Sequence, residues 1–493
     1  MSTPTRILAI DLGTSRVKVG LVDERLVTIA ASSHTYPTMT SVLGMAEQRT
    51  NDWLDAIRAA TSSVLASEPS TRIDAVVLTA QMPTLVALDA DANPIGNAVT
   101  WQDSRADALV LDLLDEVARR RVHEVAGTPI DGRYIVPMHL LRSAESAYQP
   151  AKILSAKDYL YFVLTSELVT DPSTASGFAT LDLASGEWSE ELTQLWGMDE
   201  GLLPRVVDAQ HVAELTGQGA ALLAGVAPGT PVVVGAADSV CAHHFITTIF
   251  KDSVSVIDGS STVIMATMPE ATSFDGDVLI TPLVETSTFA AETDLLATGS
   301  SVGWLAHLLA VTPDELEELA LTNPRPSDNE VIFLPYLAGG EQGVIWRSDL
   351  TGSIGGLSLS SSRADLALAL FEGIAIETVR CIQMLGRSRA IRHVVSVNGP
   401  RSRHLGASLL ASLLDVDVLA LAQQSPSLLG AALIALERIS DVEPSQSVDA
   451  AVLLSEIPTL EPAYHDALAR KAARYLSVAA VSNETHRPRK DLA

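Results

Sequence analysis

Apolar and polar residues alternate over the first two dozen positions in a way that predicts a β-hairpin. The apolar run 7–10 ends in Asp11, a Gly-Thr-Ser turn follows at 13–15, and residues 16–23 return with strand-like alternation. Such a turn gathers backbone N–H groups, two hydroxyls and a carboxylate, which suits a phosphate and a hydrated Mg²⁺ ion. A plain hairpin with a polar turn explains the same pattern, so the local sequence leaves both interpretations open.

The same pattern recurs near the middle of the chain. Residues 254–267 again show an apolar strand, an acidic residue (Asp258), a small polar turn at 259–261 and an apolar return strand. Two hairpins of one design indicate a duplicated domain. Hairpins that face each other could hold a phosphate chain from both sides.

Strand-like and helical segments alternate elsewhere. Short apolar runs at 75–80, 85–91 and 98–103 predict strands, and helical spacing at 53–66 and 106–121 predicts helices. Such alternation is typical of layered α/β domains. The remaining segments with a clear pattern are a strand, turn and helix at 393–414 and helices at 156–166, 363–385 and 425–439.

Composition narrows the classes of function. A chain of 493 residues that is 47% hydrophobic and 19% charged predicts two or three domains with large cores. The net charge of −27 makes nucleic acid and anionic membranes poor partners. Cys241 and Cys381 lie in apolar contexts, which favours buried thiols over a disulfide. Because the chain shows no signal-peptide pattern and no run of ~18–20 apolar residues, we expect a soluble, cytoplasmic protein.

Several common catalytic motifs are missing from the sequence. It has no GxxxxGK[ST] segment, no GxGxxG after a strand and no GxSxG elbow. His243 and His244 are adjacent, so they would point in different directions on a regular element and do not suit zinc.

Asp238 is the best-supported candidate for a catalytic residue. It ends the apolar run 232–237, in which Gly235, Ala236 and Ala237 leave room for a substrate. A carboxylate in this position can accept a proton from a hydroxyl as it attacks phosphorus. An Asp that caps the helix beginning at Ser239 is the alternative, and the local sequence does not decide between them.

Taken in order over about residues 6–440, the segments of this chain resemble the FGGY family of carbohydrate kinases, within the actin-like and sugar-kinase superfamily. The matching segments are DLGTSRVK (11–18), GMAEQRTNDWLDAI (44–57), the stretch 80–106 with Trp101, Asp103 and Arg105, AKDYLYFVLTSELVTDPSTASG (156–177), GAADS (235–239) and GSIGGLSLSSSRADLALALFEG (352–373). The resemblance implies two actin-like (ribonuclease H-like) ATPase domains, at 1–245 and 246–480, with a polar tail at 481–493. The active site would occupy the cleft between these domains, with sugar and phosphate on the first and nucleotide on the second.

The resemblance also implies roles for single residues. Asp238 would be the catalytic base and would contact the substrate, and Asp11 would hold Mg²⁺. Phosphate and nucleotide contacts would come from Thr14, Ser15, Lys18, Gly259, Ser260, Gly399, Ser402 and Arg403. The sugar side would be lined by Gln81, Met82, Trp101 and Asp103. The implied reaction transfers the γ-phosphoryl group of ATP to a hydroxyl of a small ketose or polyol, and a homodimer is common among such proteins.

Three departures from the family pattern bear on specificity. The xylulokinase branch reads Gln-Met-His-Gly where this chain has Gln-Met-Pro-Thr at 81–84, so a sugar-contacting His is replaced by Pro83. A Lys-x-x-Trp is not evident in 136–145, and the glycine-rich adenosine segment reads Val-Asn-Gly-Pro-Arg-Ser at 397–402. D-xylulose is the first expectation, with gluconate, ribulose, erythritol and erythrulose open. A catalytically inactive sugar sensor and a chaperone-like ATPase on this fold are the rivals.

Overall fold

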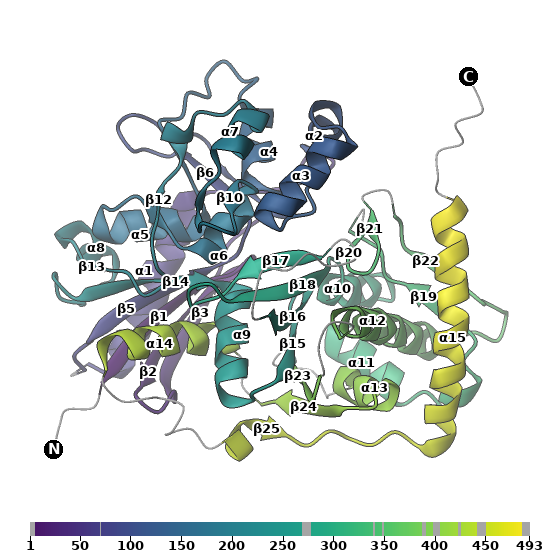
Figure 1. Cartoon of the computed structure of the whole chain (residues 1–493). Coiled ribbons are helices and arrows are strands. Elements are labelled where there is room, and N and C mark those ends of the chain that lie inside the picture. Colours follow the sequence, from purple (N-terminus) through teal and green to yellow (C-terminus); the bar gives the residue numbers. More distant parts are fainter. Residues whose placement is uncertain are drawn as a thin grey trace.

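Two α/β units lie side by side in the computed structural model, the N-terminal unit on the left and the C-terminal unit on the lower right of Figure 1. The described residues are 5–69, 71–268, 278–338, 341–347, 350–386, 391–397, 405–422, 425–440 and 450–485.

The N-terminal unit is built on a six-stranded sheet of order β13-β14-β5-β1-β2-β3. β1 pairs antiparallel with β2 and parallel with β5, and β14 continues the parallel part. The first predicted hairpin is therefore confirmed as β1 and β2. The strands are β1 (Arg6–Leu12), β2 (Arg16–Asp23), β3 (Thr28–Thr35), β5 (Ala75–Ala80), β13 (Val212–Glu214) and β14 (Pro231–Ala237).

The C-terminal unit repeats this plan. Its main sheet runs β21-β20-β18-β16-β15-β23-β24-β25, with β17 also paired to β18. β15 is antiparallel to β16 and parallel to β23, as β1 is to β2 and β5, so the second predicted hairpin and the duplication are both present. The strands are β15 (Ser253–Asp258), β16 (Thr262–Met268), β17 (Leu279–Pro282), β18 (Phe289–Leu295), β20 (Glu341–Gln342), β21 (Trp346–Arg347), β23 (His393–Val397), β24 (Asp417–Leu421) and β25 (Leu454–Ser455).

An upper lobe extends the N-terminal unit (Figure 1). It holds a small sheet of order β4-β7-β6-β8, made of β4 (Glu47–Gln48), β7 (Ala98–Thr100), β6 (Thr84–Leu88) and β8 (Lys152–Leu154). Its helices are α2 (Asp107–Leu113), α3 (Glu116–Ala126), α4 (Ile135–Arg142) and α7 (Glu190–Trp196). Two-strand pairs complete the sheets: β9 (Val169–Thr170) with β12 (Arg205–Val206), β10 (Leu181–Asp182) with β11 (Glu187–Trp188), and β19 (Ile332–Leu334) with β22 (Ser353–Gly355).

Helices cover both main sheets, and two of them lie between the units (Figure 1). The helices on the N-terminal unit are α1 (Thr50–Ser67), α5 (Ala156–Thr165), α6 (Pro172–Ala175) and α8 (Gly217–Leu222). Those of the C-terminal unit are α10 (Gly299–Leu308), α11 (Pro313–Leu321), α12 (Arg363–Leu385), α13 (Leu405–Leu413) and α15 (Pro462–Thr485). The central pair is α9 (Asp238–Ile249) and α14 (Pro426–Ile439), and α14 packs on β1, β5 and β14 although it follows the second sheet in sequence.

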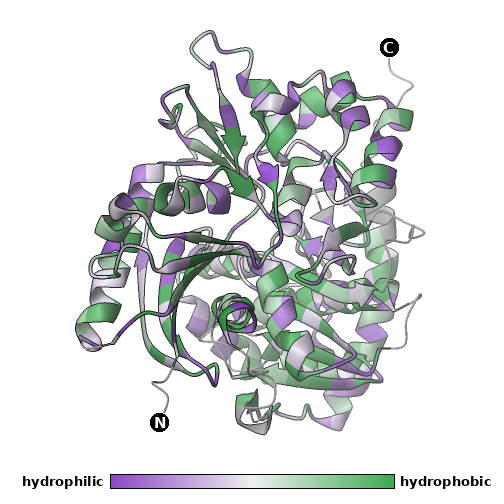
Figure 2. Ribbon diagram, turned by 60° about the vertical axis from the view of Figure 1, so that its left-hand side comes forward, coloured by the Kyte–Doolittle hydropathy of each residue, from purple (hydrophilic) through white to green (hydrophobic). Residues whose placement is uncertain are grey.

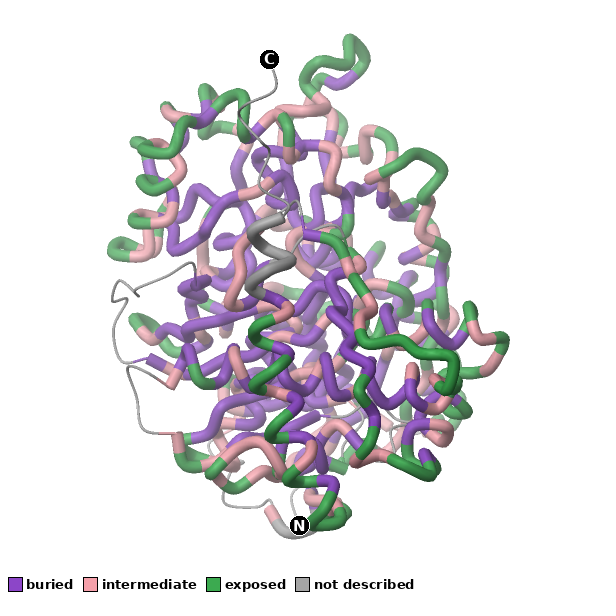
Figure 3. Tube along the Cα trace, turned by 90° about the vertical axis from the view of Figure 1, so that its right-hand side faces the viewer, coloured by how far each residue is buried: buried purple, intermediate pink, exposed green. Residues whose placement is uncertain are grey.

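One hydrophobic cluster joins the two sheets through this central pair. It contains Ile7 and Val77 from the first sheet, Met265 and Val395 from the second, and Leu433 from α14, all fully buried. Hydrophobic residues dominate the strands, and buried residues fill the interior (Figures 2 and 3). Because burial of apolar surface is the main favourable term in folding, this shared cluster ties the two units together.

The crossing of α9 and α14 depends on Gly430. A Cβ atom at this position would lie 1.7 Å from the carbonyl oxygen of Cys241, so only glycine permits the observed approach. Cys241 and Cys381 are both buried and no disulfide joins them, as the sequence predicts.

One sequence expectation differs from the structure. The single helix predicted at 106–121 is broken into α2 and α3, because Leu114 adopts an extended backbone and Asp115 caps the second helix by accepting the Ala118 N–H at 2.8 Å. The helix α15 reaches Thr485, so the first residues of the predicted polar tail are helical. No helix in the described part of the chain is long and apolar enough to cross a membrane.

We expect Gly430→Ala to lower the free energy of unfolding by ~1–3 kcal/mol, because the added methyl group forces α9 and α14 apart. Gly303→Ala is the matched control, since Gly303 is also helical and has no atom near its Cβ position; it should be neutral or stabilising by up to ~1 kcal/mol. Urea unfolding of the two variants checks this, and equal stabilities would contradict the packing role of Gly430.

Candidate active site

Three strands of the first sheet end together and bring polar residues to one edge. Leu12, Ala80 and Ala237 are register neighbours on β1, β5 and β14. The residues that follow β5 and β14 are Gln81 and Asp238, so both lie beside the turn after β1. In open α/β sheets the carboxyl ends of parallel strands form the usual ligand-binding edge.

A cleft of about 1340 Å³ lies at this edge and is lined by both hairpin turns. The second sheet contributes the ends of β15, β23 and β24 in the same way. The polar residues of the lining include Asp11, Thr14, Ser15, Lys18, Trp101, Asp238, Asp258, Ser260, Thr298 and Ser427. The structure thus gathers both halves of the predicted phosphate site around one cavity.

The first turn is held from behind by side chains that bind its carbonyl groups. The Tyr36 hydroxyl donates to the carbonyl oxygen of Gly13, and Gln48 Nε2 donates to that of Thr14 at 2.6 Å. In a trans peptide the N–H points opposite to the C=O, so the N–H groups of Thr14 and Ser15 point away from these side chains. Since Thr14 and Ser15 line the cleft, the turn presents amides suited to an anion.

Asp11 lies at the end of β1 and is almost fully buried. Its Oδ2 lies 3.4 Å from Lys18 Nζ and accepts a hydrogen bond from Ser427 Oγ at 2.8 Å. Ser427 belongs to the first turn of α14, and sequence reasoning missed it because 416 positions separate it from Asp11. Only the small-residue pattern of that helix hinted at a close approach.

Asp238 is the first residue of α9 and faces the cleft. The helix N-cap is Ala237, and among the described residues the Asp238 carboxylate accepts one hydrogen bond, from the N–H of Ser239 at 2.9 Å, so it does not act as a conventional helix cap. Burial, with a smaller contribution from Asp11, raises the pKa of Asp238 to about 7. A carboxylate that titrates near neutral pH is well matched to general-base work.

The small residues before Asp238 serve the sheet rather than the substrate, which corrects the sequence interpretation. Gly235 has a φ of +71° within a bulge of β14, and a Cβ there would lie 1.8 Å from the carbonyl oxygen of Leu78. Ala236 and Ala237 are buried. Their size allows close packing against β5.

The opposite wall of the cleft comes from the second hairpin and α10. Gly259 and Ser260 form the turn, and Ser260 accepts the N–H of Ser300 at 3.0 Å, which fixes the start of α10 against it. A Cβ at Gly299 would lie 2.1 Å from the Gly259 carbonyl oxygen. Burial raises the pKa of Asp258 to about 6. A helix N-terminus beside this turn favours negative charge.

The amide orientations of Gln48 and Gln81 follow from a series of fixed hydrogen-bond donors and acceptors. Trp53 Nε1, which can only donate, contacts Gln48 Oε1 at 3.0 Å, so Gln48 Nε2 faces Thr14. Gln81 then donates its Nε2 to Gln48 Oε1 at 3.0 Å. Its own Oε1 is buried and has no hydrogen-bond partner in the part of the chain that the structure describes. Gln81 therefore connects the predicted sugar side to the phosphate turn.

The other predicted sugar-side residues have different surroundings. Trp101 lines the cleft and donates to Thr14 Oγ1 at 3.1 Å. Asp103 is buried and engaged by Arg105, and it accepts the Ala46 N–H at 2.9 Å. Met82 contacts Gly177 and the central cluster. Gly399, Ser402 and Arg403 lie outside the described residues.

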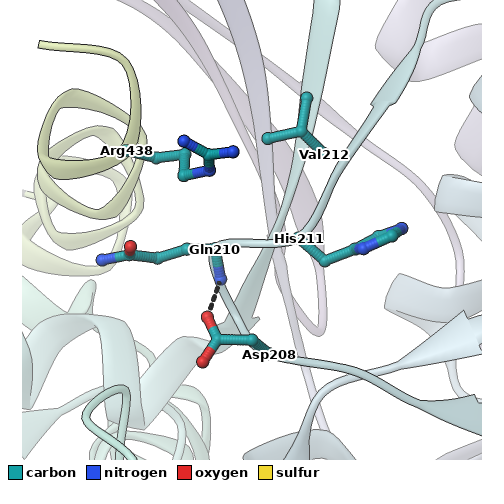
Figure 4. A pocket seen from close by; sticks show the side chains of 5 residues that line it. All are labelled: Asp208, Gln210, His211, Val212 and Arg438. Carbon is teal, nitrogen blue, oxygen red and sulfur yellow. Dashed lines mark hydrogen bonds between the residues drawn. The ribbon is translucent and has the colours of Figure 1, made fainter.

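The described residues contain no cluster of three or more His, Cys, Asp or Glu side chains suited to a metal. His243 and His244 do diverge: His243 bonds Ser255 Oγ at 2.7 Å, whereas His244 bonds Glu437 at 3.1 Å. A separate pocket of about 420 Å³ lies beside the end of α14, with Asp208 and Arg438 exposed at its rim (Figure 4). It shares no lining residue with the cleft.

The fold and cleft define a two-domain, actin-like phosphotransferase. Residues 6–244 match the model of the N-terminal domain, and residues 254–437 that of the C-terminal domain, of the FGGY family of carbohydrate kinases. The chain belongs to this family. It is a sugar kinase, and kinases of this family use ATP.

Relatives act on more than one substrate. The chain is 22% identical to a gluconokinase of Bacillus subtilis over 90% of its length and 89% of the relative. It is 26% identical to a xylulose kinase of the same organism, over 87% of each chain. A ligand-bound xylulose kinase and a gluconate kinase, both from Lactobacillus acidophilus, match the fold with TM-scores of 0.86 and 0.85. Each of these two structures shares 22% sequence identity with this chain. The alignment with the xylulose kinase covers 98% of this chain and 99% of the kinase. The alignment with the gluconate kinase covers 97% of this chain and 99% of the kinase.

If Asp238 is the general base, we expect kcat/KM to rise with pH through about 7, because only its ionised carboxylate can accept a proton. Below this pKa the rate should fall about tenfold per pH unit. A steady-state pH profile checks this, and a flat profile between about pH 5.5 and 8 would contradict the assignment.

Asp238→Asn should lower kcat by ~10²–10⁴-fold without unfolding the protein. Because the folded pKa lies above the unfolded value, the carboxyl contributes stability at low pH that is lost as pH rises through about 7. The amide removes this loss, so the variant should melt above the wild type by a larger margin at about pH 8 than at about pH 5, where only part of the loss has occurred. A calorimetric comparison at both pH values tests the sign.

Proposed function

We propose that this protein transfers the γ-phosphoryl group of ATP to a hydroxyl of a small neutral ketose or polyol, with D-xylulose as the first candidate. The observation that carries the proposal is the position of Asp238, in a cleft lined by both hairpin turns. Asp238 would accept the proton of the attacking hydroxyl. Thr14, Ser15 and Lys18 would contact the β- and γ-phosphates, opposed by Gly259 and Ser260.

Mg²⁺ fits the donor set of the cleft. The ion prefers oxygen ligands, keeps several waters and is held in kinases by one or two carboxylates together with phosphate oxygens. Asp11 offers one carboxylate beside the first turn, and Ser427 and Lys18 hold it in place. Asp11 would hold the ion through water, and the ion would offset charge on the phosphates. ATP as donor is consistent with the cytoplasmic location predicted from the sequence.

Charge near the acceptor side favours a neutral substrate. Glu292 on β18 is buried, and it lies close enough for its charge to raise the pKa of Asp238. The cation whose charge acts on Asp238 is Lys18, which lies 3.4 Å from Asp11. Arg133 is paired with Asp131 at 3.3 Å and Arg105 with Asp103 at 2.7 Å. The carboxylate of an aldonate would therefore be repelled by Glu292, and each of the cations named here already has a carboxylate partner.

Gluconate is the second candidate, because gluconokinases are among the relatives. Release of ADP by the purified protein should be measured at about pH 8 against D-xylulose, D-ribulose, erythritol, erythrulose and D-gluconate. We expect kcat/KM for a neutral acceptor to exceed that for gluconate by about tenfold or more, which corresponds to ~1.4 kcal/mol of unfavourable charge.

Glu292→Gln provides the matched control. Burial raises the pKa of Glu292 to about 7, so it is largely ionised at pH 8, and the amide removes this charge at constant size. In Glu292→Gln, the ratio of kcat/KM for a neutral acceptor to kcat/KM for gluconate should fall several-fold. A wild-type preference for gluconate would overturn the neutral-substrate proposal, and ADP release independent of any acceptor, or none with any of them, would overturn the kinase proposal.

A further inference from the structure

A buried polar chain lies directly behind Asp238. Lys157 Nζ, on α5, lies 2.9 Å from Asp171 Oδ1. The second carboxylate oxygen of Asp171 accepts a hydrogen bond from the Ser173 hydroxyl. Ser173 Oγ in turn accepts the backbone N–H of Ala237 at 3.0 Å. This series of polar contacts ends at Ala237, one residue before the proposed base Asp238.

Every side chain of this network is withdrawn from solvent. Lys157, Asp171 and Ser173 are each 1% exposed. Burial of a charged pair is costly unless its geometry and remaining hydrogen bonds are well satisfied. Asp171 Oδ2 meets this condition, because it also caps α6 through the N–H groups of Ser173 and Thr174, whereas Oδ1 faces the Lys157 ammonium and accepts no hydrogen bond among the described residues. These buried polar contacts link α5, α6 and β14.

The contact between Ser173 and Ala237 lies where the hydrogen-bond acceptors along the outer edge of β14 change from β13 to other groups. β13 pairs with β14 only at residues 231–233. Loop carbonyls then accept the N–H groups of Val234 and Gly235. The next bonded N–H on this edge is that of Ala237, and its acceptor is the Ser173 hydroxyl. Lys157 Nζ also reaches the Val234 carbonyl oxygen, at 3.5 Å.

We propose that Ser173, held by Asp171 and Lys157, is a positioning residue that sets the direction in which Asp238 leaves the strand. This inference rests on the proposed function, because it assumes that Asp238 is the base. The Ser173 hydroxyl fixes the Ala236–Ala237 peptide plane, which lies one peptide unit before the Cα atom that carries the Asp238 carboxylate. Misplacement of a reacting group by about 1 Å can cost on the order of 10²-fold in rate.

The test compares two buried serines in the same turn. Ser173→Ala removes the acceptor for the Ala237 N–H. Ser176→Ala is the matched control, because its hydroxyl donates locally to the Ser173 carbonyl oxygen at 2.7 Å. We expect Ser173→Ala to lower kcat by ~10–100-fold with little change in KM for ATP, and Ser173→Thr, which keeps the hydroxyl, to retain most of the activity.

Hydrogen exchange of the segment 231–241 gives a readout that needs no substrate. Exchange should rise in Ser173→Ala relative to Ser176→Ala. If the alanine variant fails to fold, Ser173→Cys, which keeps the size but weakens the acceptor, should lose activity relative to Ser173→Thr. Equal kcat and equal exchange in the serine variants, with an active wild type, would overturn the inference. A wild type without acceptor-dependent ADP release would instead overturn the proposed function, and the exchange comparison would still decide the positioning role.

Discussion

The close crossing of α9 and α14 is the contact on which the rest of the structure depends. Gly430 packs against the Cys241 carbonyl, so the two helices meet without intervening side-chain atoms. Asp238 is the first residue of α9, and Ser427 lies in the first turn of α14. The crossing thus fixes the proposed base relative to the hydroxyl that holds Asp11, although these residues come from distant parts of the chain.

Duplication explains why one cleft can be lined by two similar turns. Each sheet carries an antiparallel hairpin beside parallel strands, so each presents its polar turn at the carboxyl edge. The shared hydrophobic cluster brings these two edges to one cavity. The polar groups behind the edges, Tyr36 and Gln48 at the first turn and Ser173 at β14, hold backbone groups in fixed directions.

Local patterns in the sequence predicted those structural features that depend on local interactions. Both hairpins, the long helix α12 and the buried thiols follow from periodicity and composition, and the family resemblance gave the fold and the cleft. Sequence periodicity did not reveal that α14 returns to the first sheet, because that packing joins distant segments. For the same reason Ser427 and Ser173 were missed. The break at Leu114 was missed because apolar spacing continues through it, and the space at Gly235 was misinterpreted because β5 fills it.

The central claim is that the two turns hold one phosphate chain beside Asp238. A crystal structure with a non-hydrolysable ATP analogue and Mg²⁺ tests it most directly. We predict phosphate oxygens at the N–H groups of Thr14 and Ser15 on one side and at Gly259 and Ser260 on the other, with the terminal phosphate facing Asp238. Phosphates bound away from residues 11–18 would contradict the account.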